Sequence, residues 1–379
     1  MKIQSTPSFA CAIVFVITIC NTGNSQHVVF GERSTESNRR GIYIDAGGTI
    51  YPDYLISDSD MKENDGLLNN WYRSHPKEFL EIADRYECTF EEWNENNAAI
   101  LNDSVLARNI RRIGTLHGDA TKVSFLVHGF RKPFYPTTGG RPSPADYNEW
   151  KELIDEASGH SNAFVEIYWD GMYGCCFSTN SKKNKALFKL FEEAQRNATE
   201  VGKTLRRVLS GVPFDTLQAF SHSLGARVIG TALFNLSPSQ NPVPFNKQVR
   251  ICMIAPAISG GDIEKYYYDR PGIEMQPGIE MSGNYDNYKL AIIFNEKDFV
   301  LRKKDAAIGL LGPGPYKYGN TSLGCNHKKS VEKLLRYFNK LYPTSPIRAF
   351  NFEEVGKCHH VYCYCRQERF QDVMKYLEE

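Results

Sequence analysis

The sequence has almost no net charge, which argues against two classes of partner. Its 45 Lys and Arg residues nearly balance its 44 Asp and Glu residues, giving a formal net charge of +1. No block of basic residues interrupts this balance. Electrostatics therefore gives no reason to expect nucleic acid or an anionic membrane as a partner.

The apolar run near the N-terminus is too short to span a bilayer. Lys2 precedes residues 9–20, which carry no charge, and small or polar residues at 22–25 offer a cleavage site near Gln26. This is the pattern of a secretory signal. We therefore predict that residues 1–25 are removed and that the protein is exported, either to a periplasm or out of the cell, without stable membrane insertion. Lipid anchoring at Cys20 is a less favoured alternative, because Ile19 stands where a small residue is normally required.

The sequence also lacks a repeat architecture. Residues 271–276 are followed by a nearly identical copy at 277–281, but a duplication this short does not build a solenoid. It indicates a tolerated expansion of a loop, residues 261–287, which we expect to act as a lid or rim.

Cysteine is present in an even number once residues 1–25 are set aside. Disulfides are therefore possible in an exported chain, although the pairing cannot be read from the sequence. Cys252 lies inside an apolar run and is predicted to be a buried free thiol. The run from Cys358 to Cys365 contains two histidines and could bind zinc, but a second ligand pair is missing. The eight cysteines are Cys88, Cys175, Cys176, Cys252, Cys325, Cys358, Cys363 and Cys365.

Short apolar runs alternate with helical patterns from residue 120 onward, which predicts an α/β fold with a mainly parallel sheet covered by helices on both faces. We divide the chain into a signal (1–25), an N-terminal extension that packs on the core (26–115) and a main domain (116–379). Residues 41–51 are expected to form two short strands joined by a Gly-Gly turn, and residues 60–115 lean toward helix. Later strands are predicted at 122–127, 164–169, 217–220, 249–254, 289–294 and 347–352, and helices at 184–209, 226–236, 328–342 and 367–377.

The stretch around Ser223 organises the chain. An apolar strand runs into Ser221-His222-Ser223-Leu224-Gly225, and a helical pattern begins at Ala226. A strand, a tight turn and a helix with serine at the apex form a nucleophile elbow, in which a strained backbone projects the hydroxyl above the sheet. Gly225 is the small residue that the turn requires, and Ser221 stands where glycine is usual. The alternative is an ordinary polar turn.

A serine hydroxyl needs a base, and the base needs an acid to fix its tautomer. Asp298 follows a predicted late strand and is our candidate acid, ahead of Glu296 and of Asp262 in an earlier loop. Of the histidines beyond Ser223, His327 begins a charged helix, while the pair His359 and His360 follows the last strand. We choose His360 as the base on loop position, with His359 as the second choice.

An oxyanion site requires two backbone N–H donors already aimed at the developing charge. Leu224, after the nucleophile, supplies the first. Phe130 is expected to supply the second, because His128-Gly129-Phe130 follows an early strand and glycine permits close approach of the backbone. His128 is expected to support this loop through hydrogen bonds, and His222 to serve packing.

Together these motifs resemble the α/β-hydrolase superfamily, and in particular a branch of bacterial serine hydrolases with a His-Gly-Phe loop and an (Ala/Ser)-His-Ser-Leu/Met-Gly elbow. The likeness covers roughly residues 120–379. It implies an α/β-hydrolase fold with lid-like insertions and a serine hydrolase that needs no cofactor or metal. The expected activity is cleavage of a carboxylic ester or related acyl bond in a small-molecule or lipid-like substrate, through an acyl-Ser223 intermediate.

Two other functions stay open. The chain could be a binding protein that keeps the fold without turnover, or a metal-binding protein using Cys358–Cys365. The substrate depends on residues 131–147, 170–183 and 261–287, whose conformations the sequence does not predict. Neither the substrate nor the oligomeric state follows from the sequence.

Overall fold

The computed structural model describes residues 41–52, 67–130, 143–169, 183–234, 247–259, 287–302, 323–341 and 347–379. Within them a seven-stranded sheet has the order β1-β3-β2-β4-β5-β6-β7, and every pair of neighbouring strands is parallel. The strands are β1 (Gly41–Ile44), β2 (Lys122–Val127), β3 (Ala163–Trp169), β4 (Thr216–His222), β5 (Gln248–Ile254), β6 (Tyr288–Phe294) and β7 (Ile347–Asn351).

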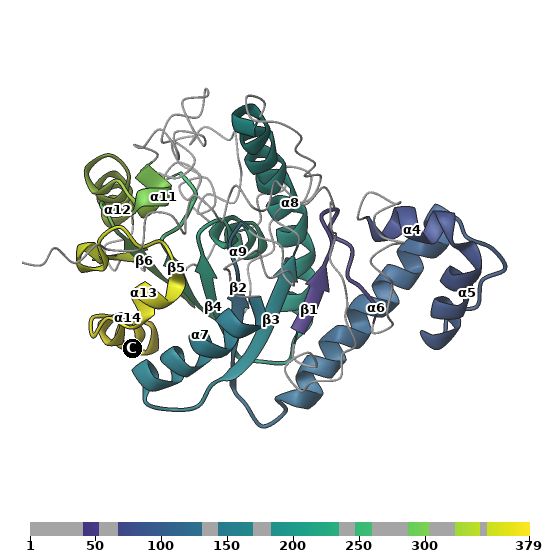
Figure 1. The fold of residues 1–379 in the computed structure, drawn as a ribbon. Helices are drawn as coiled ribbons and strands as arrows, with labels where there is room; N and C mark the ends of the chain where they lie inside the picture. Colours follow the sequence, from purple (N-terminus) through teal and green to yellow (C-terminus); the bar gives the residue numbers. More distant parts are fainter. Residues whose placement is uncertain are drawn as a thin grey trace, which may run out of the picture.

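Helices lie on both faces of this sheet, so the predicted α/β fold is confirmed (Figure 1). On one face α7 packs against α13 and α14, while α8 and α9 pack together on the other. The helices and turns are α4 (Leu68–Ser74), α5 (Pro76–Arg85), α6 (Glu95–Leu116), α7 (Ser143–Ser158), α8 (Lys183–Gly211), α9 (Gly225–Phe234), α11 (Phe299–Arg302), a π-turn (His327–Val331), α12 (Glu332–Leu341), a 3-10 turn (Glu353–Val355), α13 (Val361–Cys365) and α14 (Phe370–Glu378).

The handedness of parallel connections explains which face each helix covers. The chain runs outward from β2 to β3 through α7, and then back past β2 to β4 through α8. Because such crossovers are right-handed, connections that run in opposite directions place their helices on opposite faces. The direction in which successive strands are added to the sheet thus changes at β2, so the switch point lies between β2 and β4.

The hydrophobic core is centred on the sheet and includes the apolar faces of the helices that cover it. Central strands are buried along almost their whole length, as expected when helices cover both faces. The helices α4, α5 and α6 contribute Trp71, Tyr72, Phe79 and Leu101 to the same apolar cluster. The boundary drawn between the extension and the main domain stays a prediction.

Two predicted elements differ from the observed ones. Residues 41–51 contain one strand, β1 (Gly41–Ile44), and instead of a second strand Ile50 makes an isolated antiparallel bridge to Ile44. The helix predicted at 328–342 begins as the π-turn and becomes α-helical only at Glu332. The insertion predicted at 261–287 falls almost entirely outside the described residues.

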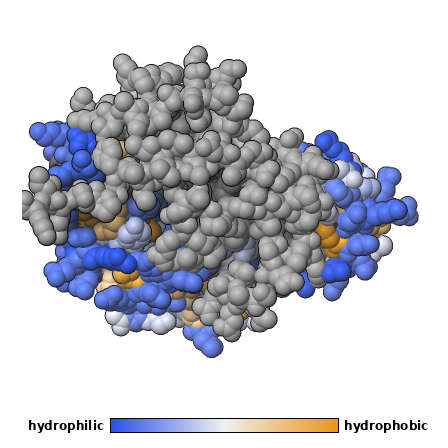
Figure 2. Space-filling model, in the orientation of Figure 1, coloured by the Kyte–Doolittle hydropathy of each residue, from blue (hydrophilic) through white to orange (hydrophobic). Residues whose placement is uncertain are grey.

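The described surface in Figure 2 is mostly hydrophilic, with small hydrophobic areas between the hydrophilic ones. Of the helices that the structure describes, none combines the length and the apolar character needed to cross a bilayer.

Asp45 ties the first strand to the N-terminal helices. Its carboxylate is buried and accepts the N–H groups of Gly47 (2.9 Å), Thr49 (2.8 Å) and Leu68 (2.8 Å), which joins the turn after β1 to the start of α4. Burial raises the pKa of Asp45 from 3.8 to about 6, against the opposing effect of these hydrogen bonds.

Because the pKa of Asp45 is higher in the folded protein than in the unfolded chain, stability should fall as the pH rises from about 4 to 6. A shift of this size corresponds to ~3 kcal/mol. We expect Asp45→Asn to remove this dependence, because the amide carries no charge at any of these pH values. Urea unfolding at pH 4 and pH 7 measures it, and identical pH dependence in both proteins would contradict the prediction.

Candidate active site

The end of β4 lies at the point where the strand order reverses. The carboxyl ends of β2 and β4 are neighbours there, with Val127 paired to Ser221. In open α/β sheets, ligands bind in the crevice outside the carboxyl ends of the strands at such a switch point. The residues that follow both strands, Gly129 and Ser223, are the ones singled out from the sequence.

Ser223 has the strained backbone that the elbow predicts. Its φ angle is 53°, in the left-handed region that residues with a side chain rarely adopt. Its N–H donates to the Ile254 carbonyl (3.0 Å), and its carbonyl accepts from the N–H of Ala257 (3.0 Å). Bonds to the last residue of β5 and to the segment after it thus stabilise the turn, and α9 begins two residues later at Gly225.

Two glycines allow the elbow and the neighbouring loop to touch. A Cβ at Gly225 would lie 2.6 Å from the carbonyl oxygens of both Val127 and His128, and one at Gly129 would lie 2.9 Å from Ser223 Cβ. Backbone cannot give way to such contacts cheaply, so both positions require glycine. Ser221 is fully buried, which accounts for a small residue there.

Asp298 and His359 form a hydrogen-bonded pair. The distance from His359 Nδ1 to Asp298 Oδ2 is 2.7 Å, although 61 positions separate the two residues. The carboxylate is fully buried, whereas the imidazole is 16% exposed. Since a carboxylate accepts, Nδ1 carries the proton, and Nε2 of a neutral ring is left as the acceptor.

Every oxygen of Asp298 is engaged. Oδ1 accepts the N–H groups of Val300 and Leu301 (3.0 Å each), and so caps the short helix α11. Oδ2 accepts from Tyr364 Oη (2.7 Å) as well as from His359. Burial, followed by the negative charge of Asp298, raises the pKa of Tyr364 well above its ordinary value. The tyrosine therefore stays protonated and donates, and the carboxylate is held in one orientation.

His360, the first choice for the base, occupies a different position. It precedes α13, and its ring stacks on Tyr362 with centroids 5.3 Å apart. The contact with Asp298 is made by His359, the second choice. Glu296 is only partly buried after β6, and Asp262 lies outside the described residues. The contacts of the described residues therefore favour His359 over His360 as the candidate base, because the His359 ring is bonded to the buried carboxylate.

The loop after β2 is built around His128, as expected. Trp169 donates its backbone N–H to His128 Nε2 (3.2 Å), so the proton is on Nδ1, which donates to the Gly129 carbonyl (2.9 Å). The His128 N–H donates to Tyr147 Oη (2.8 Å), and its ring stacks on Trp169. With both ring nitrogens engaged, His128 serves structure.

The two proposed oxyanion donors each follow a residue at which the elbow and the loop after β2 touch, Ser223 and Gly129. Leu224 follows Ser223 immediately and precedes the first turn of α9, where helix N–H groups and the helix dipole favour negative charge. Phe130 follows Gly129, and its ring packs edge-on against Phe191 of α8. No hydrogen bond between described residues joins Ser223 Oγ to His359.

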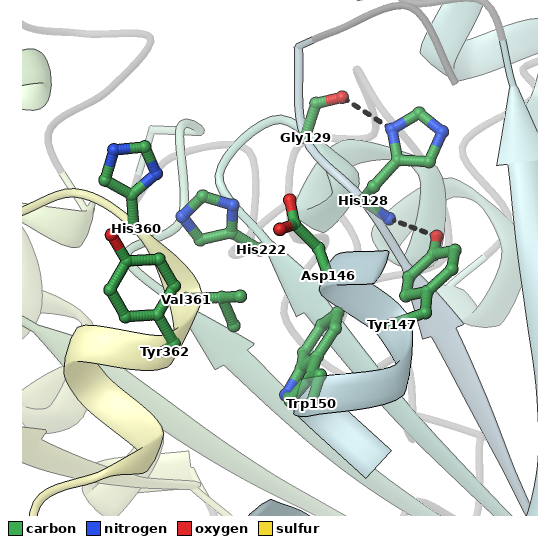
Figure 3. A pocket seen from close by; sticks show the side chains of 9 residues that line it. All are labelled: His128, Gly129, Asp146, Tyr147, Trp150, His222, His360, Val361 and Tyr362. Carbon is green, nitrogen blue, oxygen red and sulfur yellow. Dashed lines mark hydrogen bonds between the residues drawn. The ribbon is translucent and has the colours of Figure 1, made fainter. Parts of the chain in front are cut away.

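A small cavity opens beside the elbow (Figure 3). Asp146 points into it from α7, opposite His222, and the stacked rings of His360 and Tyr362 form its other side. Its full lining is His128, Gly129, Asp146, Tyr147, Trp150, His222, His360, Val361 and Tyr362. The polar side chains that line the cavity therefore lie next to the loop after β2.

Cys358 and Cys363 form a disulfide, and His359 and His360 lie between them in the sequence. This bridge removes two of the sulfur donors on which the zinc alternative depends. In the described part of the chain, no cluster of three or more His, Cys, Asp or Glu residues is arranged to hold a metal ion. Cys252 is buried and free, as predicted, and burial raises the pKa of its thiol far above the ordinary value.

Comparison with known proteins gives no family: no family model, curated protein or solved structure matches the chain. What is known of the site therefore comes from its own residues. Sequence reasoning missed Tyr364 as a partner of Asp298, and His222 as a partner of the His359 backbone. Neither contact leaves a signal in the local sequence, because each joins residues that are far apart along the chain.

Proposed function

We propose that this protein is a serine hydrolase of the α/β-hydrolase type. It would cleave a carboxylic ester or related acyl bond, with Ser223 as nucleophile, His359 as base and Asp298 as the acid that orients it. One observation carries the proposal: a buried carboxylate and a histidine are paired beside a serine in a left-handed elbow. These residues come from three separate parts of the chain.

The chemistry follows from the protonation states. As Ser223 Oγ attacks the acyl carbon, its proton passes to His359 Nε2, and Asp298 stabilises the imidazolium. Negative charge on the carbonyl oxygen is met by the N–H groups of Leu224 and Phe130. The imidazolium then gives its proton to the leaving group, and an acyl-Ser223 ester forms. Water attacks this ester, losing its proton to His359, which returns it to Ser223 as the acid is released.

The hydrogen bond from Ser223 to His359 would form when substrate is bound, since catalytic hydrogen bonds are often long in ligand-free enzymes. The substrate class, a small or lipid-like acyl compound, belongs to the proposal too. So does export after removal of residues 1–25, which the N-terminal sequence of the mature protein would test.

A fluorophosphonate probe tests the nucleophile. Incubation with the probe should add one adduct to the intact mass of the wild-type protein, because a base-activated serine attacks phosphorus. Ser223→Ala should give no adduct. Peptide mapping should place the label on Ser223.

Ser221→Gly is the matched control for this experiment. It changes a serine two positions away, in the same turn, to the residue that the elbow pattern usually has, and should keep the label. If folded wild-type protein takes no label, the non-catalytic binding function replaces the hydrolase proposal. If Ser223→Ala is labelled as fast as wild type, another residue is the nucleophile.

A further inference from the structure

His222 makes a contact that packing alone does not require. Its Nε2 lies 2.6 Å from the backbone carbonyl oxygen of His359, across a separation of 137 residues. A carbonyl oxygen only accepts, so Nε2 is protonated and donates. The two imidazole rings are tilted by 46°, with centroids 4.8 Å apart.

This hydrogen bond joins the elbow to the loop of the proposed base. His222 is the residue before Ser223, so its position is fixed by β4 and by the left-handed turn. His222 is also close to the loop after β2 that carries Phe130, because a Cβ at Gly129 would lie 3.2 Å from the His222 carbonyl oxygen. One residue therefore touches the parts of the chain that carry the nucleophile, the base and a proposed oxyanion donor.

The His359 ring needs a second fixed point. The bond to Asp298 holds Nδ1, but a ring held at one atom can still swing about it and carry Nε2 away from Ser223. Fixing the backbone carbonyl of His359 restrains the origin of the side chain. A displacement of about 1 Å in a catalytic group can cost roughly 100-fold in rate.

We propose that His222 is a positioning residue, which sets the distance between Ser223 and His359 by donating a hydrogen bond to the His359 carbonyl. This inference rests on the proposed function, since it takes His359 as the base. It assigns His222 no contact with substrate.

Two substitutions separate the hydrogen bond from the packing. His222→Leu keeps apolar bulk but has no donor, and should lower kcat for a p-nitrophenyl ester by about 10- to 100-fold, with little change in KM. His222→Gln retains a donor at similar reach and should recover most of the loss. If the glutamine variant is no better than leucine, or if the leucine variant keeps wild-type kcat, the proposal is overturned.

His117 provides a matched control. Its Nε2 also bonds a backbone carbonyl, that of Phe164 at 3.1 Å, but far from the elbow in the sequence and at the end of α6. His117→Leu should leave kcat unchanged, with any effect confined to thermal stability. An equal fall in kcat in both leucine variants would mean that the effect is general destabilisation, and would overturn the proposal.

A measurement without substrate keeps this inference separate from the proposed function. The proton between His359 and Asp298 should give a downfield imidazole signal in the NMR spectrum of the whole protein. We expect this signal to persist in His222→Gln and to shift or broaden in His222→Leu. An unchanged signal in the leucine variant overturns the positioning role, whereas failure of wild-type protein to label at Ser223 counts against the hydrolase alone.

Discussion

Replacing His359 by alanine should lower kcat by about six orders of magnitude, the scale of loss when the base of a serine hydrolase triad is removed. The same change at His360 should cost far less. His359 is the histidine hydrogen-bonded to the buried carboxylate, at 2.7 Å, while His360 stacks on Tyr362 at the cavity wall. Steady-state hydrolysis of an activated ester measures both effects.

The neighbouring histidines make this a controlled comparison, because both variants change the same loop by the same number of atoms. Thermal unfolding of each variant shows whether the loop has lost its structure. A larger loss of kcat in His360→Ala than in His359→Ala would contradict the assignment of the base and restore the choice made from the sequence.

Replacing Asp298 by asparagine should lower kcat by about 10⁴-fold. An amide can present N–H to His359 Nδ1, which favours the tautomer with its proton on Nε2, and such a ring cannot accept the proton of Ser223. The Oδ1 atom of asparagine can still accept the N–H groups of Val300 and Leu301, so the cap of α11 survives. The pH dependence of kcat should change together with its size.

Tyr364→Phe is the matched control for the acid. It removes the other side chain that donates to Asp298 Oδ2 but leaves the carboxylate and its charge in place. Its cost should correspond to one hydrogen bond to a charged group, about 1.5–3 kcal/mol, much of it in stability. If Asp298→Asn were no more harmful to kcat than Tyr364→Phe, Asp298 would not be the acid.

Features of the fold that depend on residues close together in the sequence were predictable. The elbow was, because a strand, a small-residue turn and a helix follow one another within about ten residues, and Ser223 has the left-handed φ that such a turn demands. The position of Asp298 shortly after β6 was predictable too, since acidic residues that follow a buried strand lie at the carboxyl edge of a parallel sheet.

The choice between His359 and His360 could not be made from the sequence. The two are adjacent, identical in type and in the same loop, so no pattern separates them. Contacts with Asp298, 61 positions away, and with His222, 137 positions away, decide which ring faces the carboxylate. The main pairing of residues 41–51 was missed for a similar reason: β1 pairs along its length with β3, more than 120 residues later, and makes only an isolated bridge to Ile50.

The Cys358–Cys363 bridge links the geometry of the proposed base to the redox chemistry of the surrounding medium. It closes a short ring of backbone that contains both histidines. A dithiol reductant would open this ring, forming two thiols here and a disulfide on the reductant. His359 would then lose this covalent restraint and keep its hydrogen bond to Asp298 and its ring contact with His222. Oxidising surroundings, the kind that residues 1–25 predict, would thus complete the site after the chain has folded.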